Sequence, residues 1–195
     1  MTWIVMLMGF PGSGKLTVAR ALQARLERSG HSIGLVANHS IDNIVLRVVN
    51  VGGQNPVPEG TSERIADVRA AVFQTVQDLA APTSSFIFTN HLTDSVVDID
   101  VISRLMAIAE KRESAFVPVR LLCELTEIER RIRSAERRAL MKECSAEAVI
   151  RSVEAGEMVL ATGHENELTL DVTNIPAADA AAAVERHMEA LFRRA

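Results

Sequence analysis

The residue pattern with the clearest chemistry is a glycine-rich segment near the N-terminus that fits the spacing G-x-x-x-x-G-K. Its nine residues are Gly9-Phe10-Pro11-Gly12-Ser13-Gly14-Lys15-Leu16-Thr17. Glycines allow the main chain to turn tightly with several N–H groups facing inward, and a lysine at this spacing can reach a terminal phosphate. We call residues 9–17 the phosphate loop, because a polyphosphate is the ligand that this combination fits.

A buried strand and an amphipathic helix are expected on either side of the phosphate loop. Residues 3–8 are apolar without alternation, which is typical of a parallel strand covered on both faces. After the loop, Val18, Leu22 and Leu26 repeat at helical spacing, and Gly30 is a suitable stop. The N-terminus of that helix would add positive partial charge beside a bound phosphate.

Two other interpretations also fit the glycine pattern. One is an ordinary glycine-rich turn with a solvated lysine. The other is a dinucleotide-binding loop, since Gly9, Gly12 and Gly14 also fit the spacing G-x-x-G-x-G. A dinucleotide loop requires an acidic residue at the end of the second strand, where this sequence has Ala37-Asn38-His39, and it would leave Lys15 unexplained.

Strands and helices alternate along the rest of the chain, which predicts an α/β fold with a parallel sheet. Further strands are expected at 33–36, 86–88, 116–122 and 168–172, and helices at 41–49, 65–79 and 99–108. The pattern Thr126-x-x-Glu129 resembles a capping box that opens another helix, and Pro176 begins the last one. Pro118 suggests an edge or strand-start position for the fourth strand.

Composition limits the classes of function. The chain has 195 residues, 48% hydrophobic and 24% charged, which predicts a single domain over residues 1–195. Its net charge of -4 and aromatic content of 4% argue against general binding to nucleic acid or to an anionic membrane. Cys123 and Cys144 form no C-x-x-C pair, and no signal peptide or membrane segment is evident, so a cytoplasmic location is expected.

A basic segment interrupts this acidic chain. Residues 130–142 contain six basic residues and one acidic residue. Arginines on a mobile segment can offset the charge of a transferred phosphoryl group. The alternative is a solvated helix face whose arginines pair with nearby glutamates at little gain in stability.

The string G-x-P-G-x-G-K-x-T resembles the phosphate loop of adenylate and uridylate-cytidylate kinases. The wider resemblance is to the nucleoside-monophosphate-kinase-like group of small P-loop kinases, which includes shikimate and gluconate kinases. It implies a three-layer P-loop NTPase fold with about five parallel strands, helices on both faces and a small basic lid at 130–145. It also implies ATP and Mg²⁺ as ligands of the phosphate loop, with Gly12, Gly14, Lys15 and Thr17 contacting phosphate and metal. Leu16 departs from the common Ser or Thr at its position.

The same resemblance suggests roles for residues far from the loop. Arg131 resembles the arginine at the base of the lid that packs against adenine, and Asn174, after the fifth strand, would lie beside the base. The next lid arginine of the adenylate-kinase pattern would fall at Ala135, so Arg137 and Arg138 are the expected catalytic substitutes.

The phosphate acceptor is expected at the carboxyl ends of the second and third strands, which end in polar residues. His39 is a candidate base for an acceptor hydroxyl, and the alternative is a histidine that only hydrogen-bonds within its loop. No acid directly ends either strand, so Asp94 is the nearest candidate for a metal ligand. The sequence therefore favours an ATP-dependent phosphotransferase acting on an unidentified small molecule. The alternative is a nucleotide-binding protein or slow ATPase without an acceptor.

Overall fold

The structure is a computed structural model that describes residues 2–49, 57–133 and 146–193. Its elements are β1 (Trp3–Met8), α1 (Lys15–Arg28), β2 (Ile33–Ala37), α2 (Asn38–Val49), α3 (Thr61–Asp78), β3 (Ser85–Asn90), α4 (Val96–Lys111), β4 (Ala115–Leu122), α5 (Leu125–Ile132), α7 (Ala146–Glu154), β5 (Leu168–Asp171) and α8 (Ala177–Phe192). The predicted alternation of strands and helices is confirmed.

The strands form a five-stranded parallel sheet in the order β2-β3-β1-β4-β5. β1 lies in the middle and pairs with β3 on one side and β4 on the other, so that Met8 is in register with Asn90 and with Arg120. Because all five strands run in the same direction, the phosphate loop after β1 and the residues that follow β2 and β3 meet at one edge of the sheet.

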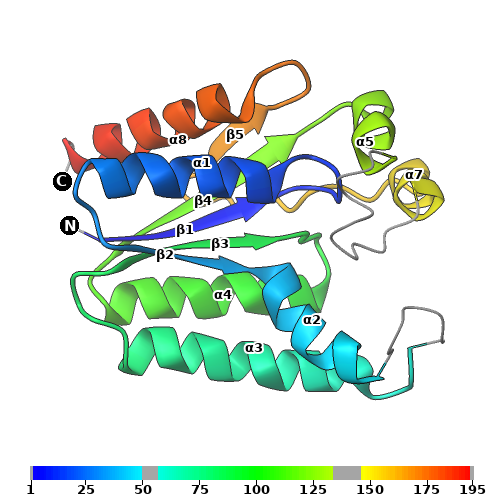
Figure 1. Cartoon of the computed structure of the whole chain (residues 1–195), viewed down its shortest axis with the longest axis horizontal. Coiled ribbons are helices and arrows are strands. Elements are labelled where there is room, and N and C mark those ends of the chain that lie inside the picture. The colour runs from blue at the N-terminus through cyan, green and yellow to red at the C-terminus, as the bar shows by residue number, and fades with distance from the viewer. Residues whose placement is uncertain (1, 50–56, 134–145, 194–195) are drawn as a thin grey trace.

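Helices cover both faces of the sheet, as Figure 1 shows: α1 and α8 lie on one face, and α3 and α4 on the other. The odd-numbered residues of β1 belong to the buried apolar cluster under α1 and α8, and the even-numbered residues to the cluster under α3 and α4. All six residues of β1 are buried. This two-sided burial explains why the segment shows no polar alternation.

The prediction of an edge or strand-start position from Pro118 is wrong, because Pro118 is the fourth residue of an interior strand. β4 lies between β1 and β5, and Pro118 is in register with Met6 of β1. Pairing of β4 with β5 begins only at Val119, so Pro118 precedes the part of β4 that has a neighbour on that side. The missing N–H of proline is tolerated because the sheet is locally open at this residue.

The predicted capping box at Thr126 is also wrong. α5 begins at Leu125, and Glu124 is its N-cap residue. The main-chain N–H of Glu124 donates a 3.0 Å hydrogen bond to Oγ1 of Thr173, in the connection between β5 and α8. A tertiary contact, rather than a local side-chain cap, therefore fixes the start of this helix.

No helix in the described part of the chain is long and apolar enough to cross a bilayer. Of the expected lid at 130–145, residues 134–145 lie outside the described residues, and Arg137 and Arg138 are among them.

Candidate nucleotide and acceptor site

The phosphate loop adopts the backbone that its glycines permit. Gly12 and Gly14 have φ angles of +96° and +93°, in the left-handed region that side chains other than glycine disfavour. Ser13 N donates to Phe10 O at 3.1 Å, and Val18 N donates to Gly14 O at 3.0 Å, where α1 begins. The loop therefore turns tightly and leads directly into a helix N-terminus, the arrangement that presents main-chain N–H groups to an anion.

Lys15, the first residue of α1, lies back over the loop. Its Nζ donates hydrogen bonds to the main-chain oxygens of Gly9 at 2.6 Å and Phe10 at 2.9 Å. The ammonium group thus lies over the turn that the glycines form, within reach of any anion that the loop amides hold.

Helix α5 packs directly against this loop. A Cβ atom added to Gly12 would lie 3.0 Å from side-chain carbons of both Ile128 and Ile132. These two isoleucines form a small buried cluster with Val149 of α7, and Phe10 packs against it. Glycine is therefore required at position 12 for two reasons: the φ angle there is positive, and α5 approaches too closely to leave room for a side chain.

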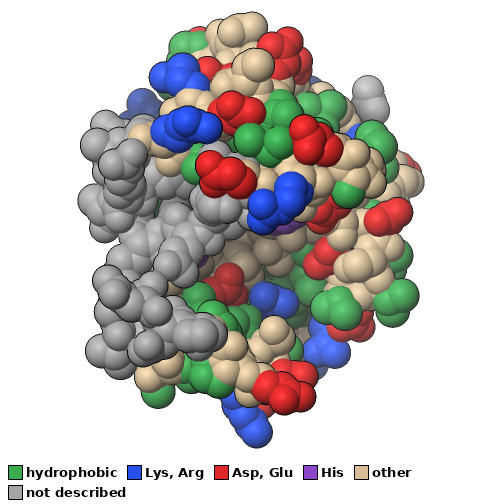
Figure 2. Space-filling view, turned by 90° about the vertical axis from the view of Figure 1, so that its right-hand side faces the viewer, with side chains coloured by type: hydrophobic (Ala, Val, Ile, Leu, Met, Phe, Trp, Pro, Cys, Tyr) green, Lys and Arg blue, Asp and Glu red, His purple; other side chains and the backbone are tan. Residues whose placement is uncertain are grey.

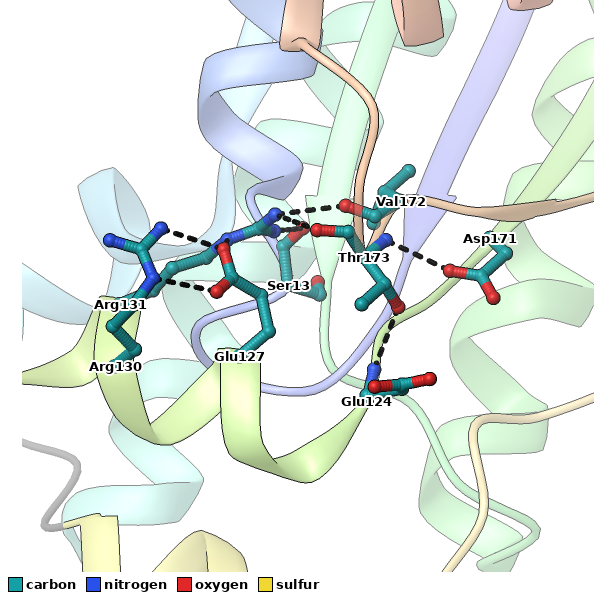
Figure 3. A network of polar contacts seen from close by, with 8 residues as sticks. All are labelled: Ser13, Glu124, Glu127, Arg130, Arg131, Asp171, Val172 and Thr173. Atoms are coloured by element: carbon teal, nitrogen blue, oxygen red, sulfur yellow. Dashed lines mark hydrogen bonds and ion pairs between the residues drawn. The ribbon is translucent and has the colours of Figure 1, made fainter.

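Arg131 connects three parts of the site by hydrogen bonds: its own helix α5, the phosphate loop, and the connection between β5 and α8 (Figure 3). Its Nη1 donates to Ser13 O of the phosphate loop at 3.2 Å. Its Nη2 donates to the main-chain oxygens of Val172 at 2.8 Å and Thr173 at 3.0 Å, in the connection between β5 and α8. The arginine expected beside adenine thus lies between the phosphate loop and the segment that contains Asn174.

Glu127 orients this arginine. One carboxylate oxygen accepts a 2.6 Å hydrogen bond from Nε of Arg131, and the carboxylate also accepts two bonds from Arg130, at 2.6 and 2.7 Å. Hydrogen bonds from Arg130, with those from Arg131, lower the pKa of Glu127 to about 2 against the opposing effect of burial. Glu127 therefore stays ionised and holds Arg131 in place throughout the neutral range.

The carboxyl end of β3 places His91, one of the polar residues expected beside the acceptor after the third strand, next to the phosphate loop. The ring of His91 packs against the ring of Phe10 with centroids 4.8 Å apart, and Nε2 lies 3.9 Å from a carboxylate oxygen of Glu157. Burial lowers the pKa of His91, the charge of Lys15 lowers it further, and Glu157 and Asp98 act in the opposite direction. The imidazole is therefore neutral at neutral pH and lies against Phe10 of the phosphate loop.

The sequence and structure were compared with known proteins. No family model and no curated protein matches the chain. Among solved structures, a gluconokinase from Sinorhizobium meliloti matches with a TM-score of 0.58 and 16% identity over 98% of this chain and 97% of that one. Kti12 of Chaetomium thermophilum, solved with ADP-AlF3, matches with a TM-score of 0.60 and 17% identity over 97% of both chains. The APS kinase CysC of Mycobacterium tuberculosis, solved with AMPPNP and APS, matches with a TM-score of 0.59 and 15% identity over 96% of this chain and 98% of that one.

The chain has the fold of the small P-loop kinases. The sheet order, with the glycine-rich loop after its central strand, is common to this fold, and the predicted three-layer α/β architecture is confirmed. At these identities the likeness establishes the fold, and the activity of the chain has to be argued from its own residues.

A second polar cluster lies beyond the carboxyl end of β2, on the side of the sheet covered by α3 and α4. Nδ2 of Asn38 donates to Asp42 at 2.6 Å, and Nη2 of Arg69 donates to Oδ1 of Asn38 at 3.1 Å. Arg69 and Asp42 also form an ion pair at 3.6 Å. Asn38, Arg69 and Asn90 line a small cavity whose remaining wall is largely apolar, so the cluster lies where this fold brings β2 and β3 to the edge that carries the phosphate loop.

The other predicted site residues are more dispersed. His39 is in the first turn of α2, Leu16 is half-buried in the first turn of α1, and Thr17 beside it is exposed. Asp94 is exposed between β3 and α4, and Asn174 is exposed between β5 and α8. Within the described ranges, no group of three or more His, Cys, Asp or Glu side chains could hold a metal ion. The phosphate loop thus fits a polyphosphate. For Mg²⁺, the described residues offer only isolated candidate ligands, such as Thr17, and no cluster of ligands.

The pH dependence of stability tests the placement of His91. A histidine whose pKa is lowered by folding stabilises the protein fully above the unfolded value near 6.5, and this contribution is lost as the pH falls below it. We expect the free energy of unfolding to decrease between pH 7.5 and pH 5.5, by at most about 1.4 kcal/mol per pH unit for this one proton. His91→Gln should make that decrease smaller in urea titrations.

The exposed His31 provides the matched control, because its ring only lies edge-on against Trp3. His31→Gln should keep the wild-type pH dependence. An identical pH profile for His91→Gln and the wild type would show that His91 is not held neutral next to Lys15.

Proposed function

We propose that the protein is an ATP-dependent phosphotransferase that moves the γ-phosphate of ATP to a small molecule. The observation that carries this proposal is the phosphate loop itself: two glycines with positive φ angles lead into a helix whose first residue is Lys15, after the central strand of a P-loop kinase fold. The gluconokinase and the APS kinase are known by names that describe transfer to small molecules, which supports the same class of reaction.

In this proposal each group of the chain has a separate role. The loop amides and Lys15 bind the phosphates, and Arg131 keeps the loop, α5 and the segment at Asn174 in one arrangement around the nucleotide. Mg²⁺, held through Thr17, water and phosphate oxygens, would supply charge neutralisation at the phosphates. Arg137 and Arg138 are the proposed cations for the transferred group, and they lie outside the described residues.

The acceptor would supply a hydroxyl oxygen that forms a bond to the γ-phosphorus while the bond to the bridging oxygen of ADP breaks. The hydroxyl proton would go to a neutral imidazole, for which His39 and His91 are the candidates. His91 has a specific argument in its favour, because it packs against Phe10 of the phosphate loop, and burial and then the charge of Lys15 lower its pKa and keep it unprotonated.

One observation favours the second candidate function, a nucleotide-binding protein or slow ATPase without an acceptor. β3 ends in Asn90 beside the phosphate loop, an amide at the position where a metal-organising carboxylate is expected. Asp98, on the following helix, is engaged by the N–H and hydroxyl of Thr93 at 2.9 and 2.8 Å.

Release of ADP distinguishes the two functions. We expect the purified protein with ATP and Mg²⁺ to release ADP slowly alone and at least about tenfold faster when a fractionated pool of small metabolites contains the acceptor, since positioning of two substrates dominates this chemistry. Mass spectrometry of the stimulating fraction should show a product heavier by one phosphoryl group. Binding of ATP by calorimetry, with no fraction that accelerates ADP release, would favour the acceptor-free alternative.

A further inference from the structure

The cavity at the ends of β2 and β3 has an unusual charge balance for a site that would hold a kinase substrate. Arg69 is the cation among its described lining residues. Its charge is matched by Asp42 at 3.6 Å, and the side chains of both residues are only 20% exposed. The pair therefore contributes no net charge to attract a carboxylate or phosphate group.

The amide of Asn38 holds the ion pair together. Its Nδ2 donates to Asp42 and its Oδ1 accepts from Arg69, so both ends of the amide are already used within the cluster. Within the described part of the chain, the buried Nε of Arg69 has no hydrogen-bond partner. A buried donor left without an acceptor destabilises a protein, so this N–H favours a neighbouring oxygen atom, whether of water or of a ligand that displaces it.

The size and the wall of the cavity limit what that ligand can be. The enclosed part of the cavity has room for a group about as large as a water molecule, such as a hydroxyl, and the empty space including the part open to solvent measures about 230 Å³. Phe73, Phe88, Val101 and Leu105 form much of its wall, and the two phenylalanine rings pack edge to face with centroids 5.5 Å apart. An apolar wall provides no hydration for a charged group.

Burial raises the pKa of Asp42 above its ordinary value, and Arg69 opposes that effect. A further anion next to Asp42 would be repelled by the ionised carboxylate and would compete with it for Arg69. Figure 2 shows that charged side chains of both signs lie in the hollow at this end of the molecule, rather than a field of one sign.

We propose that this cavity binds the phosphate acceptor by an uncharged oxygen-bearing group, such as a hydroxyl on an otherwise apolar portion, and that the Asp42–Arg69 ion pair excludes anionic acceptors. The acceptor role rests on the function proposed above. Neutral alcohols with an apolar body are accordingly the substrate class, in preference to sugar acids and nucleotides.

A matched pair of probes tests the charge preference directly. Benzyl alcohol and benzoate have the same ring and nearly the same size, and they differ in one negative charge. With the phosphate loop saturated by a non-hydrolysable ATP analogue, we expect benzyl alcohol to shift the side-chain amide NMR signals of Asn38 and Asn90, and benzoate to bind at least about tenfold more weakly. Equal or tighter binding of benzoate, or no shift at these amides with either probe, would overturn the proposal.

Variants at Asp42 show whether the ion pair causes the preference. Asp42→Asn leaves Arg69 without its countercharge, so the preference should move by about tenfold or more toward benzoate. Asp42→Glu retains the charge and should retain the preference for benzyl alcohol, and this result would also show that a substitution at this position leaves the fold intact. A preference unchanged in Asp42→Asn, with native thermal unfolding, would contradict the role of the pair.

The outcomes separate this inference from the proposed function. An acceptor identified by ADP release that carries an anionic group into the cavity would leave the kinase function standing and refute the inference. If benzyl alcohol binds selectively but no metabolite pool accelerates ADP release, the binding preference is supported and its connection to phosphoryl transfer is removed.

Discussion

Lys15→Ala is expected to lower ATP-dependent ADP release by at least about 100-fold, the range found when one preorganised charge-stabilising group is removed from an active site. Nζ of Lys15 lies over the turn of the phosphate loop, bonded to the oxygens of Gly9 and Phe10. No other side chain of the loop carries a positive charge. Alanine is well tolerated in a helix, but the oxygens of Gly9 and Phe10 lose their donor, so the free energy of unfolding should fall by about 1–3 kcal/mol while the protein remains folded at the assay temperature. A coupled ADP assay and calorimetric titration with ATP measure the effect.

Lys111→Ala is the control for Lys15→Ala. Lys111 ends α4 and forms an exposed ion pair with Asp78 at 2.8 Å. Removing a lysine there should leave ADP release and ATP binding at wild-type values, because exposed ion pairs contribute little. Wild-type turnover in Lys15→Ala would refute the assignment of the phosphate loop, whereas equal losses in both variants would indicate a general effect of charge.

Arg131→Met is expected to lower the free energy of unfolding by about 2–4 kcal/mol, since each polar partner left unsatisfied in a protein costs about 1–3 kcal/mol. The substitution removes hydrogen bonds to three main-chain oxygens, those of Ser13, Val172 and Thr173, and so breaks the polar connection of α5 to the phosphate loop while leaving its apolar packing. The affinity for ATP should also fall, because the phosphate loop loses the hydrogen bonds through which Arg131 connects this loop to the β5–α8 segment. Urea titration and calorimetry measure the two effects.

The adjacent arginine offers a close comparison. Arg130 pairs with the same Glu127, but its side chain is 73% exposed. Arg130→Met should therefore change the stability by no more than about 1 kcal/mol and leave ATP affinity unchanged. Similar losses in the two variants would mean that Arg131 acts as one more surface charge and has no special role at the loop.

The phosphate loop and its flanking elements could be predicted because their signals are local. The apolar run of residues 3–8 has the length of β1, and the glycines at positions 12 and 14 lie where positive φ angles occur. Five parallel strands were likewise expected from the alternation of patterns. These features depend on neighbours within one turn or one strand, which the sequence displays directly.

Predictions that depended on distant partners were less successful. Pro118 indicated an edge because a sequence cannot show where β5 begins to pair with β4. Thr126 resembled a helix cap, but Thr173, 49 residues away from Glu124, fixes the start of α5. His91 was expected only as one of several polar residues after the third strand, because its contact with Phe10 and the effect of the Lys15 charge arise only when β3 pairs beside β1.

The sequence by itself determined the fold class and the tight turn of residues 9–17, because backbone freedom at glycine and hydrophobic burial along one strand are properties of short segments. The tertiary structure decided the order of the strands, the bonds of Arg131 to two separate loops, and the pairing of Asp42 with Arg69, which lines a largely apolar cavity. These arrangements join residues from different elements, and the charge or pKa of each group depends on neighbours that only the folded chain brings within a few ångströms.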